Sequence, residues 1–436
     1  MVLPDRWVWS TIEDVAIAQS GVGFPKSLQG KTSGDFPLVK VSDISNAVKE
    51  FGGVLHRANN YLSDAEAKKI GAKIFPSGTA MFAKIGEAVR LNRRALVALP
   101  LLADNNVMGL LPRDNIVPKY LFYFLHTIDL YEYSQATTVP SVRKTDVLQI
   151  PLPLPPLDEQ ERIVARIESL LTQLDAGVAA LKRVQVVLKR YRASVLKSAC
   201  EGRLVLQDPN DEPAEVLLQL FSKSPLAGDD FSSLPSGWCW VRVGDISKQS
   251  QCGTSEKANL DSSGIPVLRM GNIQNGQLDF DNLKYLPAEL PELENLILED
   301  GDLIFNRTNS AELVGKTAVY KKHHPRATFA SYLIRIKFQE IFLSDYVCIY
   351  INSLYGRKYI SSVVSQQVGQ ANVNGKKLAN MPLPLPPLSE QRRIVAEVER
   401  QLSMVQELEQ TVSINLKRAA RMRQAILQRA LEGKLV

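Results

Sequence analysis

Two long stretches of the chain, near residues 158–201 and 389–432, repeat apolar side chains every seven positions. A period of seven that persists over five repeats is typical of a coiled coil. The two series of the first stretch are Ile163, Leu170, Gly177, Val184, Tyr191 and Ser198, and Ile167, Leu174, Leu181, Leu188 and Val195. Those of the second stretch are Ile394, Gln401, Leu408, Asn415, Met422 and Arg429, and Val398, Val405, Val412, Ala419 and Ile426. The pattern predicts two long helices that pair with each other.

The residues that flank these stretches indicate where each helix begins and ends. A segment PLPLPPL precedes each stretch and cannot be helical, because proline lacks an N–H and restricts the residue before it. Asp158 and Ser389 are good N-caps, and Gly202 and Gly433 suit the left-handed position after a helix. About 44 residues remain for each helix, which corresponds to roughly 66 Å.

The pairing of the helices leaves two points open. A pseudo-two-fold axis between the two stretches would make the helices antiparallel, whereas the alternative is a long helix that lies along its own domain. In a register that is symmetric end to end, Gly177 faces Asn415. A small residue opposite a buried asparagine would fix that register.

An internal repeat relates the two stretches. Residues 151–205 align without a gap with residues 382–436 at an offset of 231, with 23 identities in 55 positions. Both copies continue from the proline box into Glu-Gln and Arg-Ile-Val-Ala, and both end in Glu-Gly-basic-Leu-Val. A repeat of this length defines two units of similar size.

The beginnings of the two units also match, but their middles diverge. Trp7 and Trp9 correspond to Trp238 and Trp240, and their alternation indicates a strand whose tryptophans lie in the core. The best local pairings further on are Pro37 with Pro266, residues 78–95 with 301–318, Lys84 with Arg307, Arg93 with Lys316, and Ser134 with Ser365.

The composition adds little beyond an excess of basic over acidic residues. The net charge is +6, although the segment 206–233 carries one lysine against six acidic residues. Such a balance permits a polyanionic partner without proving one. The four cysteines and four histidines form no metal-ligand spacing. We therefore expect reduced, structural thiols in a cytoplasmic protein with no metal and no cofactor.

Motifs for catalysis or for membrane insertion are missing from the sequence. No stretch is apolar enough to cross a membrane, and no segment has the layout of a signal peptide. The chain lacks the [DNS]-P-P-[YFW] motif of amino-methyltransferases and the GxxxxGK[ST] phosphate loop of motor proteins. We therefore expect a protein that is not an enzyme. The missing motifs also argue against a modification enzyme that works alone.

The duplicated proline box, the Glu-Gln dipeptide and the long helix that ends in Glu-Gly-basic-Leu resemble the specificity subunit of Type I restriction-modification systems. The resemblance covers essentially the whole chain and implies an α/β (α+β) fold. It implies two globular target recognition domains joined by two antiparallel helices in a coiled coil, with a pseudo-two-fold repeat. The expected segments are recognition domain 1 (1–150), proline box and helix 1 (151–205), an acidic linker (206–233), recognition domain 2 (234–381), and proline box and helix 2 (382–436).

The resemblance also implies a function and partners. Each recognition domain would bind one half of a bipartite site in double-stranded DNA. The helices would set the spacing and dock two methylation subunits, and restriction-motor subunits would complete the complex. A rod of roughly 66 Å would hold the domains at most about 19 base pairs apart. The alternative is a coiled-coil adaptor whose domains bind peptides and not DNA.

Two stretches in each domain carry side chains suited to DNA. The first is basic and includes Lys84, Arg90, Arg93 and Arg94, and then Arg307, Thr308, Asn309, Lys316, Lys321 and Lys322 in the second domain. The second is the loop before each proline box, residues 134–144 and 365–376, with Ser141, Arg143, Lys144, Gln370, Asn372 and Asn374. These residue types bind phosphates and base edges. The alternatives are solvated surface charges and ordinary polar turns. The segment 321–326 is expected to be a loop, with His323 and His324 badly placed for a shared metal.

Overall fold

The computed structural model describes residues 3–134, 139–226, 233–367 and 370–435, and within these ranges the chain is a mixed α/β protein. It divides into two compact units. Unit 1 comprises Met1–Lys182 and Ser413–Val436, and unit 2 comprises Arg183–Val412. Each unit therefore contains part of both long helices. Among the described residues, no helix is long and apolar enough to cross a membrane.

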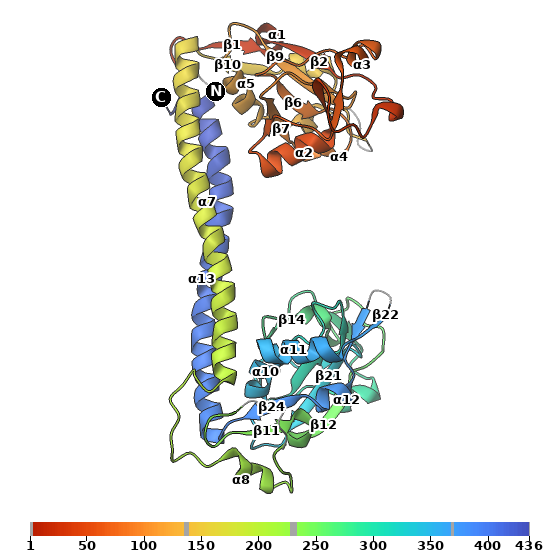
Figure 1. Cartoon of the computed structure of the whole chain (residues 1–436), viewed down its shortest axis with the longest axis vertical. Coiled ribbons are helices and arrows are strands. Elements are labelled where there is room, and N and C mark those ends of the chain that lie inside the picture. The colour runs from red at the N-terminus through yellow and green to blue at the C-terminus, as the bar shows by residue number, and fades with distance from the viewer. Residues whose placement is uncertain (1–2, 135–138, 227–232, 368–369, 436) are drawn as a thin grey trace. The chain divides into compact units, whose positions relative to one another are not determined.

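Unit 1 is built on a five-stranded sheet with helices on both sides. The strand order is β2 (Ala16–Ser20), β9 (Val107–Pro112), β6 (Ala80–Ala83), β7 (Arg94–Val97) and β4 (Val54–Leu55). Helix α2 (Val41–Glu50) packs with Met81 and Ala95 in one core cluster, whereas α5 (Pro118–Leu125) packs with Ala80 and Phe82 in another. Successive residues of β6 thus point to opposite faces, as the pleat of a strand requires. Figure 1 labels α2, α5, β6 and β7 within this unit.

A smaller three-stranded sheet stands beside the main sheet of unit 1. Its central strand β3 (Phe36–Val39) pairs antiparallel with β5 (Asn60–Leu62) and parallel with β8 (Leu102–Ala103). Two short helices, α1 (Ile12–Val15) and α3 (Asp64–Lys69), follow β1 (Val8–Thr11) and β5. Ser63 caps α3 by accepting a hydrogen bond from the Glu66 N–H.

Unit 2 repeats this plan with different details. Its main sheet has the order β12 (Ser247–Cys252), β21 (Leu333–Phe338), β17 (Leu303–Asn306) and β19 (Thr317–Val319). Its smaller sheet has β13 (Ile265–Leu268) between β16 (Lys284–Leu286) and β20 (Thr328–Phe329). The pairing of Pro37 with Pro266 is confirmed, because both prolines are the second residue of equivalent strands, β3 and β13.

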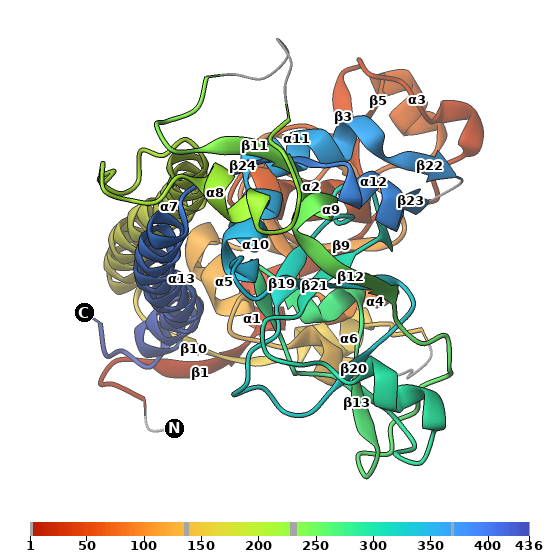
Figure 2. The same cartoon turned by 90° about the horizontal axis from the view of Figure 1, so that it is seen from below.

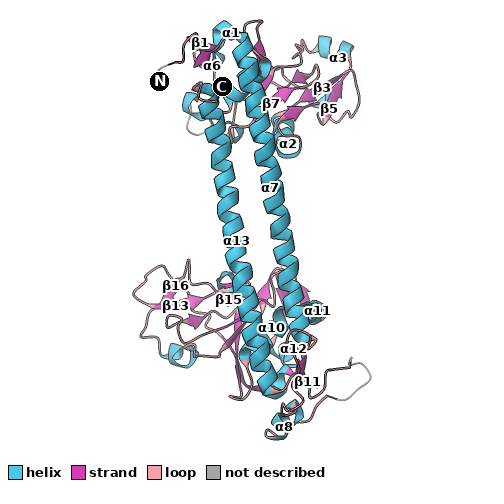
Figure 3. Cartoon of the chain, turned by 90° about the vertical axis from the view of Figure 1, so that its left-hand side faces the viewer, coloured by secondary structure: helices cyan, strands magenta, loops and turns pink. Residues whose placement is uncertain are grey.

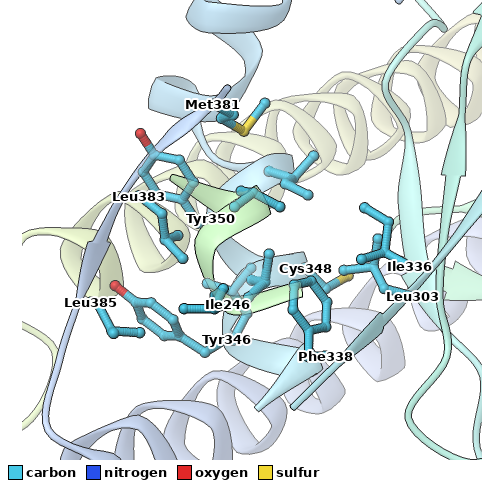
Figure 4. Packing of buried hydrophobic residues seen from close by; sticks show 14 of the residues in the cluster. Ile246, Leu303, Ile336, Phe338, Tyr346, Cys348, Tyr350, Met381, Leu383 and Leu385 are labelled. Atoms are coloured by element: carbon cyan, nitrogen blue, oxygen red, sulfur yellow. The ribbon is translucent and has the colours of Figure 1, made fainter. Parts of the chain in front are cut away.

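Two features distinguish unit 2, and a third, the packing of α10 (Ser344–Asn352), has a counterpart in α5 of unit 1. A short hairpin, β14 (Ile273–Gln274) and β15 (Gln277–Leu278), lies against the edge strand β19. A second helix, α11 (Leu354–Val363), follows α10. The aromatic side chains of α10 fill the core, where Tyr346 and Tyr350 lie with Leu383 and Leu385 (Figure 4).

The ends of the two long helices agree closely with the sequence prediction. α7 (Leu157–Cys200) and α13 (Leu388–Leu431) each contain 44 residues. Gly202 and Gly433 have φ angles of 65° and 67°, so both occupy the predicted left-handed position. The predicted starts at Asp158 and Ser389 were one residue late, because the carbonyls of Pro156 and Pro387 already accept hydrogen bonds from the first turn.

The conserved ends of the repeat join each unit to its helix. A two-stranded ribbon pairs β1 (Val8–Thr11) with β10 (Pro151–Leu154), and a second pairs β11 (Cys239–Arg242) with β24 (Pro382–Leu385). The indole N–H of Trp7 donates to the Glu159 carboxylate at 2.9 Å. In unit 2 the Trp238 N–H donates to Glu390 at 2.8 Å. The Glu-Gln dipeptide therefore has a structural role.

The tryptophan prediction was correct for only half of its residues. Trp7 and Trp238 are buried, at 6% and 8% exposure. Trp9 is 53% exposed, and Trp240 is half-buried. Trp9 lies within β1, whose ribbon has only two strands, so one of its sides remains open to solvent. Trp7 precedes the strand, and the expected alternation does not include it.

The sequence predicted two series of residues in each helix that form the contact between the helices, here called the seam. One of the two series was predicted correctly. The series from Ile167 to Val195 and from Val398 to Ile426 are buried or half-buried throughout. In the other series Ile163 and Ile394 are buried as predicted, at 1% and 0% exposure, but further along the helices the buried residues lie one position later than predicted, for example at Leu171 and Ala199. Gly177 is exposed, so the proposed contact between Gly177 and Asn415 is wrong.

Polar contacts join α7 to α13 inside each unit. In unit 1, Asp175 and Arg423 form an ion pair. In unit 2, the Tyr191 hydroxyl donates to Gln401 at 2.9 Å, and Arg192 lies 3.3 Å from Glu409. Within each unit the two helices lie side by side (Figures 1 and 3).

The described part of the acidic linker packs on unit 2. Its short helix α8 (Ala214–Gln219) contributes Leu217 and Leu218 to the core. Asp211 forms an ion pair with Arg393 of α13 at 2.6 Å, and this guanidinium lowers the pKa of the Asp211 carboxyl. Residues 227–232 of the linker lie outside the described residues.

All four cysteines are free, but they differ in environment. Cys200 and Cys348 are buried, and burial raises the pKa of each thiol to about 12. Cys239 is half-buried. Cys252 is exposed, and its sulfur accepts a hydrogen bond from Arg307 at 3.1 Å. Cys252 is the last residue of the edge strand β12, where solvent reaches its side chain.

Candidate nucleic-acid interface

Lys84 and Arg307 occupy equivalent places in the two units. Each is the first residue after the corresponding strand, β6 or β17. The Lys84 ammonium donates to the Ser20 hydroxyl at 3.2 Å, and Arg307 Nη1 donates to Cys252 Sγ at 3.1 Å. Both cations are thus held against the last residue of the edge strand, β2 or β12.

The two predicted stretches of each unit meet at these basic residues. The Val142 N–H donates to the Lys84 carbonyl, and the Val373 N–H donates to the Arg307 carbonyl, both at 2.9 Å. In unit 1 the contact continues as an isolated bridge between Ile85 and Ser141. Segments that are 58 residues apart in sequence in unit 1 and 66 residues apart in unit 2 therefore form one surface.

In unit 2 this contact is extended into a small sheet. β18 (Thr308–Asn309) pairs with β23 (Gln370–Asn372), which pairs with β22 (Ser365–Gln367). The Asn372 amide donates to the Thr308 hydroxyl at 2.7 Å. The strands lie beside α12 (Gly375–Ala379) (Figures 1 and 2). Residues 135–138 and 368–369 of the predicted loops lie outside the described residues.

The strand end that completes each site was not predicted from the sequence. Gln19-Ser20-Gly21 ends β2, and Gln251-Cys252-Gly253 ends β12. A Cβ at Gly21 would lie 2.1 Å from the Asp104 carbonyl oxygen, and one at Gly253 would lie 2.1 Å from that of Phe329. Only glycine permits this close approach. The signal was present in the sequence as a repeated Gln-x-Gly at an offset of 232.

Arg94 must be removed from the candidates. Its side chain is 1% exposed, and its guanidinium donates to the Asn92 and Ile128 carbonyls, the latter at 2.7 Å. Burial lowers the pKa of Arg94 to about 10. Arg94 begins β7, a strand inside the main sheet, and it holds the neighbouring loop in place.

The other basic residues of the first stretch stay near the surface. Arg90 is exposed, lies 3.5 Å from Glu87 and stacks over the Tyr131 ring at 4.5 Å. Arg93 is half-buried and precedes β7, as Lys316 precedes β19. The predicted equivalence of Arg93 and Lys316 is therefore confirmed.

The three candidate lysines of unit 2 lie apart from Arg307 or point away from it, namely Lys316, Lys321 and Lys322. Lys316 donates to Gln274 at 3.1 Å. Lys321 pairs with Asp345 at 2.6 Å. Both line a separate groove of about 770 Å³ beside α10. Lys321 and Lys322 follow β19, so they lie at the opposite end of the β17–β19 hairpin from Arg307. The segment 321–326 is a loop, as predicted.

The remaining candidates surround a short helix in each unit. Arg143 and Asn374 are the equivalent N-cap residues of α6 (Lys144–Leu148) and α12. Arg143 and Lys144 are exposed. The Asn374 side chain accepts a hydrogen bond from the Lys377 N–H at 2.9 Å, so its oxygen serves as a cap. Gln370 is exposed on β23.

The side chains of each site are suited to binding nucleic acid. Cations, hydroxyls and amides converge on one surface in each unit, and such groups contact phosphates and base edges. The described residues contain no group of three or more His, Cys, Asp or Glu side chains placed to hold a metal.

The fold and these sites define a tandem α/β protein with one matched basic site in each unit. The model of the Type I restriction modification DNA specificity domain matches residues 4–182 and 235–418. The chain therefore belongs to this family.

Known relatives agree with this assignment. The chain is 27% identical to the EcoKI specificity subunit of Escherichia coli over 443 residues, which covers 99% of this chain and 90% of the relative. It is 24% identical to the StySPI specificity subunit of Salmonella potsdam over 99% of this chain and 90% of the relative. A chain from a structure on complex assembly and conformational transition of the type I R-M system matches with a TM-score of 0.69, at 21% identity and with 100% of both chains covered. This last likeness supports the fold.

Proposed function

We propose that this chain is the non-catalytic DNA specificity subunit of a Type I restriction-modification complex in the cytoplasm. Each recognition domain, residues 1–150 or 234–381, binds one half of a bipartite site in double-stranded DNA. The observation that carries the proposal is the matched pair of Lys84 and Arg307, each fixed by the same hydrogen bonds at the same place in its unit. A peptide-binding adaptor would not need one basic site repeated in both units.

The helices set the distance between the half-sites in this proposal. Their buried series supports an antiparallel coiled coil with a pseudo-two-fold axis between the repeats. The Arg192–Glu409 and Asp175–Arg423 pairs support it further, because Arg192 and Arg423 are equivalent in the repeat. Residues 206–233 connect the two halves.

The outer surface of the helices is the docking site that we propose for the methylation subunits. In unit 2, six apolar side chains of α7 and α13 are between 41% and 60% exposed, namely Val184, Val186, Val187, Tyr191, Met404 and Leu408. The Tyr191–Gln401 hydrogen bond places the two rows side by side. Exposed apolar groups of this kind mark protein interfaces. Restriction-motor subunits would join the same complex.

Two measurements test the DNA function. The chain assembled with its methylation subunits is mixed with duplex DNA, and modified-base sequencing identifies the methylated sites. Exchange of residues 1–150 for those of a related subunit should change one half of the site and leave the other unchanged. A change in both halves would contradict the modular assignment.

Substitution of single basic residues tests the site itself. Lys84→Ala and Arg307→Ala should each weaken DNA binding and reduce the slope of log affinity against log salt by about 1, because each removes one phosphate contact. Lys322→Ala is the matched control, since this exposed lysine lies at the far end of its hairpin. Equal losses for Lys322→Ala and Arg307→Ala would refute the placement of the interface.

A further inference from the structure

A four-residue turn lies directly beside the basic residue in each unit. Asp104–Val107 follows β8, and the Val107 N–H closes the turn on the Asp104 carbonyl at 3.1 Å. Ala330–Leu333 follows β20 and is closed in the same way at 2.9 Å. Neither turn was predicted from the sequence.

The third residue of each turn is fastened to the basic residue. The Lys84 N–H donates to the Asn106 carbonyl at 2.9 Å, and the Arg307 N–H donates to the Tyr332 carbonyl at 3.0 Å. Asn106 and Tyr332 are therefore equivalent positions, held one hydrogen bond away from the cation of their own unit.

The edge strand fastens the other side of each turn. The Val22 N–H donates to the Ala103 carbonyl, and the Thr254 N–H donates to the Phe329 carbonyl, both at 3.0 Å. The N–H groups of Gly21 and Gly253 also donate to the carbonyls of the last turn residues, Val107 and Leu333, at 3.1 Å and 3.3 Å. A turn that is hydrogen-bonded on both sides presents its side chains from a fixed backbone.

The two units share this backbone arrangement and differ in the side chain at the third position of the turn. Position 106 is a half-buried asparagine, whose amide donates one N–H to the Asp104 carboxylate at 3.4 Å and keeps its second N–H and its oxygen for a base edge. Position 332 is a tyrosine whose side chain is 48% exposed. An exposed aromatic ring beside an arginine provides an apolar surface together with one hydroxyl. A constant frame with exchanged side chains is what two different half-sites require.

We infer that these turns determine base specificity: Asn106 and Tyr332 discriminate bases in their own half-sites, whereas Lys84 and Arg307 hold the DNA backbone. This inference rests on the proposed function. It assigns the tyrosine a contact with the apolar face or edge of a base, and the asparagine an amide contact with a base edge.

The test exchanges the two side chains in the full chain, assembled with its methylation subunits. Tyr332→Asn and Asn106→Tyr are compared with the parent on a library of duplexes with randomised half-sites, and methylation is mapped by sequencing. Each exchange should change the preference at one or two positions of one half-site by about tenfold or more. Each should affect a different half. Tyr332→Phe separates the hydroxyl from the ring, and Leu260→Asn, at an 81% exposed residue of the same unit, is the control.

The possible outcomes distinguish a failure of the inference from a failure of the proposed function on which it rests. Unchanged preference for Tyr332→Asn, with methylation retained, overturns the inference and leaves the DNA function standing. An altered preference in both half-sites overturns it as well. If Tyr332→Asn does not assemble, Asn106→Tyr decides in the other unit, and unchanged preference there overturns the inference. A parent complex that methylates no duplex contradicts the proposed function itself.

Discussion

At the scale of single residues, several side chains that are identical in both copies of the repeat make hydrogen bonds at the start of the long helix. The glutamates of the Glu-Gln dipeptide accept from Trp7 and Trp238. The adjacent Gln160 and Gln391 donate to the carbonyls of Pro155 and Pro386, both at 2.9 Å. An unpaired buried polar group costs about 1–3 kcal/mol, so these residues cannot vary independently.

His126 gives unit 1 a dependence on pH. Burial, with smaller effects of Arg94 and Arg423, lowers its pKa from 6.5 to about 4. Between these values the unfolded chain binds a proton that the folded unit does not bind. Stability therefore falls as the pH drops from 6.5 towards 4, by on the order of 1 kcal/mol between pH 7.5 and 5.5.

Denaturant unfolding at both pH values measures this effect. His126→Gln should lose less stability on acidification than the parent chain, because residue 126 no longer titrates. His56→Gln, at an exposed histidine of the same unit, should behave like the parent. An identical loss for the parent and for His126→Gln would show that the proton is bound elsewhere.

Residue burial also explains why the site was only partly predictable. Arg93 and Arg94 are adjacent and chemically equal in sequence, yet only Arg94 begins a strand that lies inside a sheet. Which of two neighbours points inward depends on the register of β7 with β6, and no local pattern states that register. Lys84 and Arg307 were identified because the repeat aligned them.

At the scale of elements, the long helices were predictable because strong local signals mark their ends. The proline boxes and the two glycines fix those ends to within one residue. The seam was harder to predict, because polar residues occupy part of it and apolar residues lie outside it. Arg192 and Glu409 lie at half-buried positions of the seam, whereas Val184 and Tyr191 are more than 40% exposed. A search for apolar spacing therefore chooses the exposed residues.

The Arg192–Glu409 pair should stabilise the helix contact in unit 2. The two side chains are 18% and 36% exposed and lie 3.3 Å apart. Arg192→Glu and Glu409→Arg each bring like charges together, and each should lower stability by about 1 kcal/mol. The double exchange restores an opposite pair and should recover most of the loss.

A double-mutant cycle on thermal unfolding measures this coupling. Arg190→Glu is a suitable control, because Arg190 is exposed on the same helix. Purely additive losses in the double variant would mean that the two residues do not interact, which would weaken the case for pairing in this register.

At the scale of the whole molecule, one chain contains two versions of the same structural plan. The strand order of the main sheet, the turn beside the basic residue and the tryptophan-to-helix hydrogen bond all recur. Unit 1 adds β4 at the sheet edge, and unit 2 adds the β14–β15 hairpin there instead. Duplication preserves what attaches a unit to the helices and frees the rest to diverge, which is the organisation expected of a protein that recognises two unlike half-sites.

The proposed spacing function leads to a quantitative prediction. Removal of residues 179–185 from α7 and of the equivalent residues 410–416 from α13 deletes one heptad from each helix and preserves the phase of the seam. Each helix becomes about 10.5 Å shorter, which corresponds to about three base pairs of duplex. The spacer between the methylated half-sites should therefore shorten by about three base pairs, while both half-sites keep their sequences. Deletion from α7 alone should instead mismatch the two helices and prevent assembly, so an unchanged spacer in the double deletion would refute the spacing role and leave base recognition untouched.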